Sequence, residues 1–184
     1  FTKVAHETEV GPFLGVIPVY EDKTPHINGW MVTKAVESWS WRGCEGRTAH
    51  VEVYARAHSV ELLLNGRSVA KKRVKRNSCR TLFDITYESG TLTAVSYDKN
   101  GNEIGRCSLK TAEEDTVLSL LPDEESVKPN GLAFVRLEYT DKNGVWKPME
   151  RHNLTVTVEN GSLAGLGNAC PYKKAPGSGG SVNL

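Results

Sequence analysis

Residues 60–71 read VELLLNGRSVAK, and this stretch decides the fold. An apolar run precedes Asn65-Gly66 and an alternating run follows it, as in two antiparallel strands joined by a two-residue turn. Asn and Gly both accept the positive φ angles that a type I′ turn requires. The stretch therefore predicts a β-hairpin with strands over 60–64 and 67–71.

The same alternation of polar and apolar residues continues on both sides of this hairpin. Further strands are expected over 50–54, 81–87, 91–97 and 103–109, with turns at Ser89-Gly90 and 99–101. Helical periodicity is almost absent. Short strands at this spacing, separated by turn residues, are typical of a β-sandwich.

A polar, acidic stretch over 111–115 interrupts the pattern and predicts a domain boundary. Alternation resumes at 117–121, and later strands are expected over 132–140 and 153–158. The predicted fold class is all-β, with two consecutive immunoglobulin-like β-sandwich modules, the second incomplete. The predicted parts are an extended lead-in over 1–36, a first module over 37–111, a second module over 116–172 and a linker-like tail over 173–184.

Composition argues against several classes of function. Lys and Arg total 23 against 22 Asp and Glu, so the net charge of +1 offers no strong field for nucleic acid or an anionic membrane. The apolar runs are too short to cross a bilayer. The cysteines lack metal-ligand spacing, so we expect reduced thiols, no metal and no cofactor. These cysteines are Cys44, Cys79, Cys107 and Cys170.

Several segments resemble a known enzyme family. Those in the first half are similar to the β-sandwich module that follows the catalytic barrel in bacterial glycoside hydrolase family 2 β-galactosidases. Those in the second half are similar to the immunoglobulin-like domain near the C-terminus of the same enzymes. The segments are ESWSW (37–41), VEVY (51–54), VELLLNGRS (60–68), GTLTAVSYD (90–98), LAFV (132–135), DKNG (141–144) and GSLAGLGN (161–168). Two departures are Gly131, where the family usually has an acidic residue, and the family's further strands, which this chain lacks.

The resemblance implies accessory domains of a retaining glycosidase and not its catalytic centre. Hydrolysis in this family is carried by two glutamates on a barrel, and no barrel fits in this chain. The implied partners are the catalytic barrel and the N-terminal domains of the parent chain. The acidic runs 113–115 and 123–125 are more simply explained as solvated loops. The sequence leaves the parent's compartment open.

Other chemical motifs have ordinary structural explanations. No nucleophile motif accompanies the histidines His6, His26, His50, His58 and His152. The basic run 67–76 is expected to be a solvated strand face, or an edge that its charge protects from aggregation. The glycine-rich stretch 161–168 has no helix behind it, so tight turns are expected there and not a phosphate site.

Trp39 and Trp41 are the candidate carbohydrate contacts. Residues two apart on a strand share a face, and their rings could form a flat platform on which a sugar stacks. Tryptophan in a small sandwich is more often core or interdomain packing. Three hypotheses stay open: an accessory structural module of a family 2 glycosidase, a carbohydrate-binding module with Trp39 or Trp41 exposed, and an immunoglobulin-like interaction domain.

Overall fold

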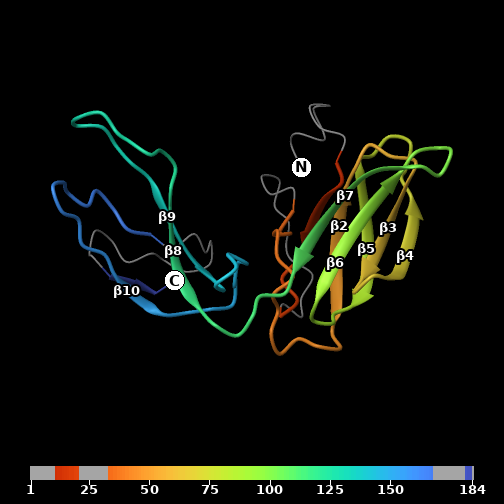
Figure 1. Cartoon of the computed structure of the whole chain (residues 1–184), viewed down its shortest axis with the longest axis horizontal. Coiled ribbons are helices and arrows are strands. Elements are labelled where there is room, and N and C mark those ends of the chain that lie inside the picture. The colour runs from red at the N-terminus through yellow and green to blue at the C-terminus, as the bar shows by residue number, and fades with distance from the viewer. Residues whose placement is uncertain (1–10, 21–32, 168–180, 184) are drawn as a thin grey trace. The chain divides into compact units, whose positions relative to one another are not determined.

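The computed structural model describes residues 11–20, 33–167 and 181–183, and its described regular elements are strands (Figure 1). The chain divides into two compact units, 1–148 and 149–184, which we describe separately. The predictions for His6, His26 and Cys170 fall outside the described residues. The all-β prediction is confirmed.

Two antiparallel sheets form the body of the first unit. The three-stranded sheet has the order β1-β2-β5, and the four-stranded sheet has the order β4-β3-β6-β7 (Figure 1). Their strands are β1 (Phe13–Val16), β2 (Thr48–Tyr54), β3 (Ser59–Leu64), β4 (Arg67–Arg73), β5 (Arg80–Thr86), β6 (Thr91–Tyr97) and β7 (Glu103–Lys110).

Alternation along each strand builds the core between these sheets. On β3, Val60, Leu62 and Leu64 are buried, while the residues between them are partly exposed. On β5, Phe83 is buried and Leu82 faces outward with 50% of its surface exposed. Side chains from both sheets join one apolar cluster, as expected for facing sheets that each bury one side.

The Asn65-Gly66 turn joins β3 to β4 as predicted. Both residues have positive φ, 52° and 80°, and Leu64 pairs directly with Arg67 across the turn. The Asn65 side chain also accepts a hydrogen bond from Thr91 N (2.8 Å) and donates one to Ser89 O (3.1 Å). A Cβ on Gly90 would lie 1.9 Å from Asn65 Oδ1, so the turn between β5 and β6 needs glycine there.

The strand β1 differs from the sequence analysis, which assigned residues 1–36 to a lead-in. Phe13–Val16 pairs antiparallel with β2 and forms an edge of the three-stranded sheet. Pro12 and Pro18 flank this strand, and proline is tolerated at strand ends and edges because it lacks an N–H to donate. The alternation that marks the inner strands is too short here to be recognised.

The remaining strands form two small ladders. In the first unit, β8 (Val117–Pro122) pairs with β9 (Val135–Thr140), and the latter begins three residues later than expected. Leu120 and Phe134 on or beside this ladder are 63% and 64% exposed. In the second unit, β10 (Asn153–Thr155) pairs with β11 (Ser181–Asn183), inside the expected tail. Two-stranded ladders of this kind are marginal by themselves.

The core arrangement predicts a contrast between two leucines. Leu62→Ala removes a fully buried side chain and should lower the free energy of unfolding by about 2–5 kcal/mol. Leu82→Ala changes an outward-facing side chain and should change it by less than about 0.5 kcal/mol. Urea unfolding followed by tryptophan fluorescence measures both, and equal losses would contradict the assigned strand faces.

Candidate functional site

The two candidate sugar contacts are both buried. Trp39 and Trp41 have 0% exposed surface and lie in an irregular segment before β2, so they do not share a strand face. The Trp39 ring packs edge-on against Tyr87, with ring centroids 4.7 Å apart, and its Nε1 donates to Glu88 O. Both rings are packed inside the protein in this structure, whereas stacking a sugar needs an exposed ring face.

The backbone around Trp39 ties together the ends of both sheets. Its carbonyl oxygen accepts hydrogen bonds from Tyr87 Oη (3.3 Å), just after β5, and from Thr111 Oγ1 (2.8 Å), just after β7. Tyr87 Oη in turn accepts a hydrogen bond from Trp41 N (3.0 Å). The segment therefore closes one end of the sandwich.

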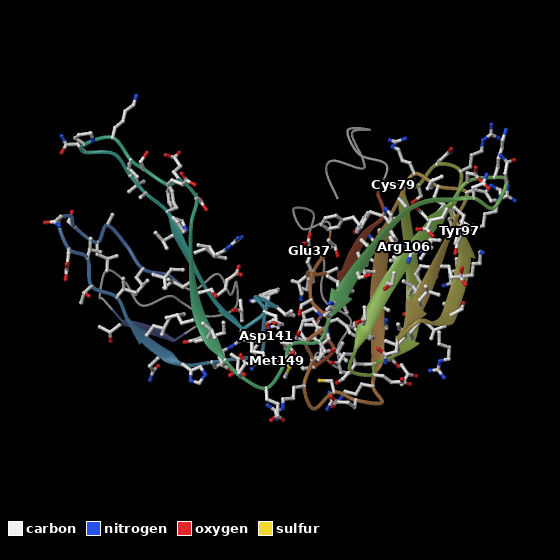
Figure 2. The ribbon with its side chains drawn as sticks, in the orientation of Figure 1. Glu37, Cys79, Tyr97, Arg106, Asp141 and Met149 are labelled. Carbon is white, nitrogen blue, oxygen red and sulfur yellow. The ribbon has the colours of Figure 1, made fainter. Side chains whose placement is uncertain are left out.

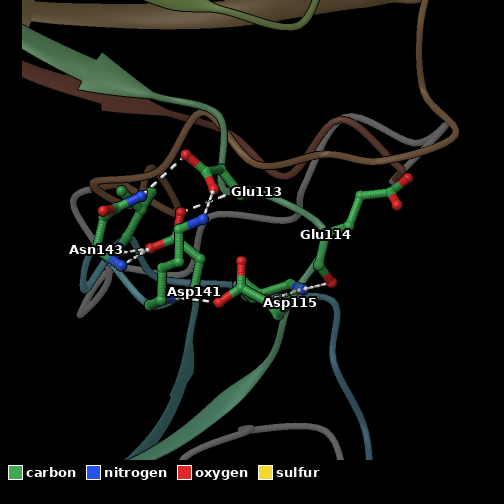
Figure 3. Close-up of polar contacts among 8 residues, drawn as sticks. Glu113, Glu114, Asp115, Asp141 and Asn143 are labelled. Carbon is green, nitrogen blue, oxygen red and sulfur yellow. Dashed lines mark hydrogen bonds and ion pairs between the residues drawn. The ribbon is translucent and has the colours of Figure 1, made fainter.

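A polar junction follows the sandwich and is built around Asp141 (Figure 3). Its carboxylate accepts hydrogen bonds from the backbone N–H groups of Glu113, Asn143 and Val145, each at 2.9 Å. The last two close the turn between β9 and Trp146, and the first fixes the segment that leaves β7. One buried side chain thus joins two stretches about thirty residues apart.

Lys147 supplies the positive charge of this junction. Its side chain is buried, and Nζ donates to Glu114 O (3.0 Å), Asp115 O (2.9 Å) and Thr116 Oγ1 (2.7 Å). An oxygen cage of this kind suits a cation, and here the cation is the protein's own ammonium group. The acidic run 113–115 is therefore partly structural, although the Glu114 side chain is 90% exposed.

The pKa of Asp141 reflects a competition. Burial alone would raise it, but the three backbone donors and the nearby charge of Lys147 outweigh burial and hold the pKa below its ordinary value of 3.8. A group with a depressed folded pKa stabilises the native state above its unfolded pKa. That contribution is lost as the pH falls through the folded value.

Glu52 is a buried acid that alternation did not reveal. The pattern of β2 places it on the outer face of the three-stranded sheet, where solvent would be expected, yet it is only 1% exposed. It accepts a hydrogen bond from Tyr54 Oη and lies 3.4 Å from Arg80 Nη2. Burial, followed by the bond to Glu52 and the charge of Glu52, raises the pKa of Tyr54. The burial of Glu52 comes from other parts of the folded chain, and the alternation along one strand carries no information about them.

The remaining candidates do not form a reactive cluster in the described part of the chain. His50 hydrogen-bonds Asp84 at the surface (2.6 Å), and His152 lies 3.2 Å from Glu150.

Within the described residues, no group of three His, Cys, Asp or Glu side chains could hold a metal ion. No helix among the same residues is long and apolar enough to span a membrane. Burial raises the pKa of the free Cys107 thiol to about 11.

Comparison with known proteins places this architecture. A domain of unknown function, DUF4982, matches residues 46–105, from just before β2 into β7. The β-galactosidase BoGH2A of Bacteroides ovatus is 27% identical over 150 residues, which are 80% of this chain. A glycosyl hydrolase family 2 structure from Bacteroides cellulosilyticus superposes with a TM-score of 0.74 and 28% identity over 92% of this chain. The chain matches the C-terminal portion of glycoside hydrolase family 2 β-glycosidases.

The chain is much shorter than these relatives. It spans 16% of the length of BoGH2A and 23% of the Bacteroides cellulosilyticus structure, so this region sits with other domains in those proteins. A β-glucuronidase of the same family, at 18% identity and a TM-score of 0.63, shares the fold. The sequence resemblance to family 2 is thereby confirmed.

The junction predicts a pH-dependent effect of Asp141→Asn. The amide cannot accept all three N–H donors, so protection of the Asn143 and Val145 amides from hydrogen exchange should fall by a factor on the order of ten near neutral pH. The difference from the unsubstituted protein should persist down to the ordinary carboxyl pKa of 3.8 and should shrink only as the pH falls through the lower pKa of the native Asp141 carboxylate, where that group also becomes protonated. Glu114→Gln, at the exposed position, is the control and should leave protection unchanged.

Proposed function

We propose that this chain provides non-catalytic accessory modules of a family 2 glycosidase, whose hydrolysis of O-glycosyl bonds is performed by a catalytic barrel elsewhere in the parent chain. In this proposal, residues 37–111 and 116–172 are consecutive immunoglobulin-like modules, and the barrel and N-terminal domains are their partners. The observation that carries the proposal is the match over most of this chain to a small share of much longer glycosidases.

The use of the buried carboxylates supports a structural role. Glycoside hydrolysis requires two carboxyl groups about 5–9 Å apart that flank the scissile bond. Glu52 is committed to Tyr54 and Arg80, and Asp141 is committed to backbone N–H groups. Neither carboxylate is available to transfer a proton to a substrate without breaking the contacts that hold its segment.

Two alternatives have less support. A carbohydrate-binding module built on Trp39 and Trp41 would need an exposed ring, and both indoles are buried. Further domains of a parent chain can only cover more surface, so they would not expose the rings in this conformation. An immunoglobulin-like interaction domain unrelated to hydrolysis would not account for the match to family 2 enzymes.

The first test is turnover by the chain itself. The purified, folded chain should not hydrolyse p-nitrophenyl β-galactoside or p-nitrophenyl β-glucuronide, because the catalytic glutamates of the family would lie outside it. A full-length family 2 β-galactosidase is the positive control. Hydrolytic activity that co-purifies with this chain through successive purification steps would overturn the proposal.

The second test separates support from chemistry in the full-length parent. Lys147→Met leaves the acceptors of Glu114, Asp115 and Thr116 without their ammonium donor, so the enzyme should lose activity at a lower temperature. At moderate temperature kcat and KM should stay unchanged. A fall in kcat in the folded variant would contradict a purely supporting role.

A further inference from the structure

A hollow of about 1070 Å³ lies at one end of the first sandwich. Two connections line it: residues 55–58, between β2 and β3, and residues 74–79, between β4 and β5, together with the last residue of β4. Cys79 and Tyr97 are labelled at this end of the sandwich in Figure 2. The hollow is as large as typical ligand pockets, which measure about 300–1,000 Å³.

The lining is cationic. Its charged side chains are Arg56, Arg73, Lys75 and Arg76, and His58 adds an imidazole. The lining includes no aspartate or glutamate. The like charges of Arg73, Lys75 and Arg76 repel one another around this hollow, and a bound anion would relieve this repulsion.

The neighbouring lysines of the same basic run have other uses. Lys71 lies 3.6 Å from Glu61 and 4.2 Å from the centre of the Tyr97 ring. Lys72 donates to Leu82 O (2.7 Å). These contacts fasten β4, the edge strand, whose charged exposed surface was predicted.

Three of the cations that line the hollow, unlike Lys71, have no acidic partner in the described part of the chain. Among the described residues, Arg73, Lys75 and Arg76 form no ion pair with an acid. The backbone of the β4–β5 connection is fixed independently, since Val74 N donates to His58 O and Ser78 N donates to Lys75 O, each at 3.0 Å. The fold therefore does not depend on these three charges.

The lining also restricts the chemistry of a ligand. Guanidinium groups bind carboxylate and phosphate oxygens through paired hydrogen bonds, and sulfate presents the same kind of anionic oxygens. The lining contains no Trp, Tyr or Phe, so it offers no aromatic ring on which a neutral sugar could stack. A flexible chain that carries carboxylate or sulfate groups fits these features better than a neutral sugar does.

We propose that this hollow binds an acidic polysaccharide through its uronate carboxylates or sulfate esters. The choice of a saccharide over an acidic peptide rests on the proposed function, since the parent would act on carbohydrate. If the binding proposal fails, the proposed accessory role still stands, because that role is tested separately by turnover and thermal inactivation.

Isothermal titration of the whole chain tests the site. The ligands are an oligogalacturonate, which carries only carboxylates, a chondroitin sulfate oligosaccharide, which adds sulfates, and a neutral galacto-oligosaccharide of similar length. We expect saturable binding of one or both acidic ligands, weakened by salt, and none of the neutral one. The two acidic ligands distinguish carboxylate from sulfate recognition.

A matched pair of double variants locates the binding. Lys75→Gln/Arg76→Gln removes two charges from the hollow and should weaken acidic-glycan binding about tenfold or more. Arg67→Gln/Lys110→Gln removes the same two residue types at the opposite end of the sandwich and should have little effect. All four side chains lie at exposed positions, and the thermal midpoint of each variant checks its folding.

Three results would overturn the proposal. The folded chain could bind neither acidic glycan, or both double variants could weaken binding equally, which would indicate net charge alone. Poly-glutamate or single-stranded DNA could also bind as tightly as the acidic glycans, which would indicate a general anion surface. Preferential glycan binding that is lost only in the hollow variant supports the site.

Discussion

The closure of the two-sheet sandwich by Trp39 is the contact on which the rest of the first unit depends. Two facing sheets bury their inner sides only if the gap at their ends is filled. The indole fills that gap against Tyr87, while its carbonyl oxygen joins the ends of β5 and β7. Ala112 comes directly after Thr111, and its N–H donates to Ser40 Oγ (2.9 Å). The segment around Trp39 therefore also fixes where the chain leaves the sandwich.

The junction around Asp141 and Lys147 continues this constraint beyond the sandwich. It replaces apolar packing by hydrogen bonds, which are directional and therefore set the geometry of a short connection more closely than a few apolar contacts could. The ladder of β8 and β9 illustrates the contrast, because Leu120 and Phe134 remain largely exposed there.

Much of the fold could be predicted because strand alternation and turn residues are local signals. The hairpin at Asn65-Gly66 and the strands on both sides of it follow from such signals. Glu52 shows what local signals cannot predict. The same alternation that identifies β2 as a strand assigns Glu52 to solvent, and only the tertiary structure buries it. The cationic hollow was equally hidden, because its lining comes from two connections separated in sequence, and the basic run alone suggested only a charged edge.

The hydrogen bonds of the Asn65 side chain affect the chemical stability of the protein. Asparagine followed by glycine is prone to deamidation, in which the glycine nitrogen attacks the carbonyl carbon of the side-chain amide and ammonia leaves. Water then opens the resulting succinimide ring to aspartate or isoaspartate. Ring closure requires the amide to turn toward Gly66 N, and the hydrogen bonds to Ser89 O and Thr91 N oppose that rotation. The native fold thus slows an ageing reaction that its own turn sequence invites, and unfolded molecules lose this protection.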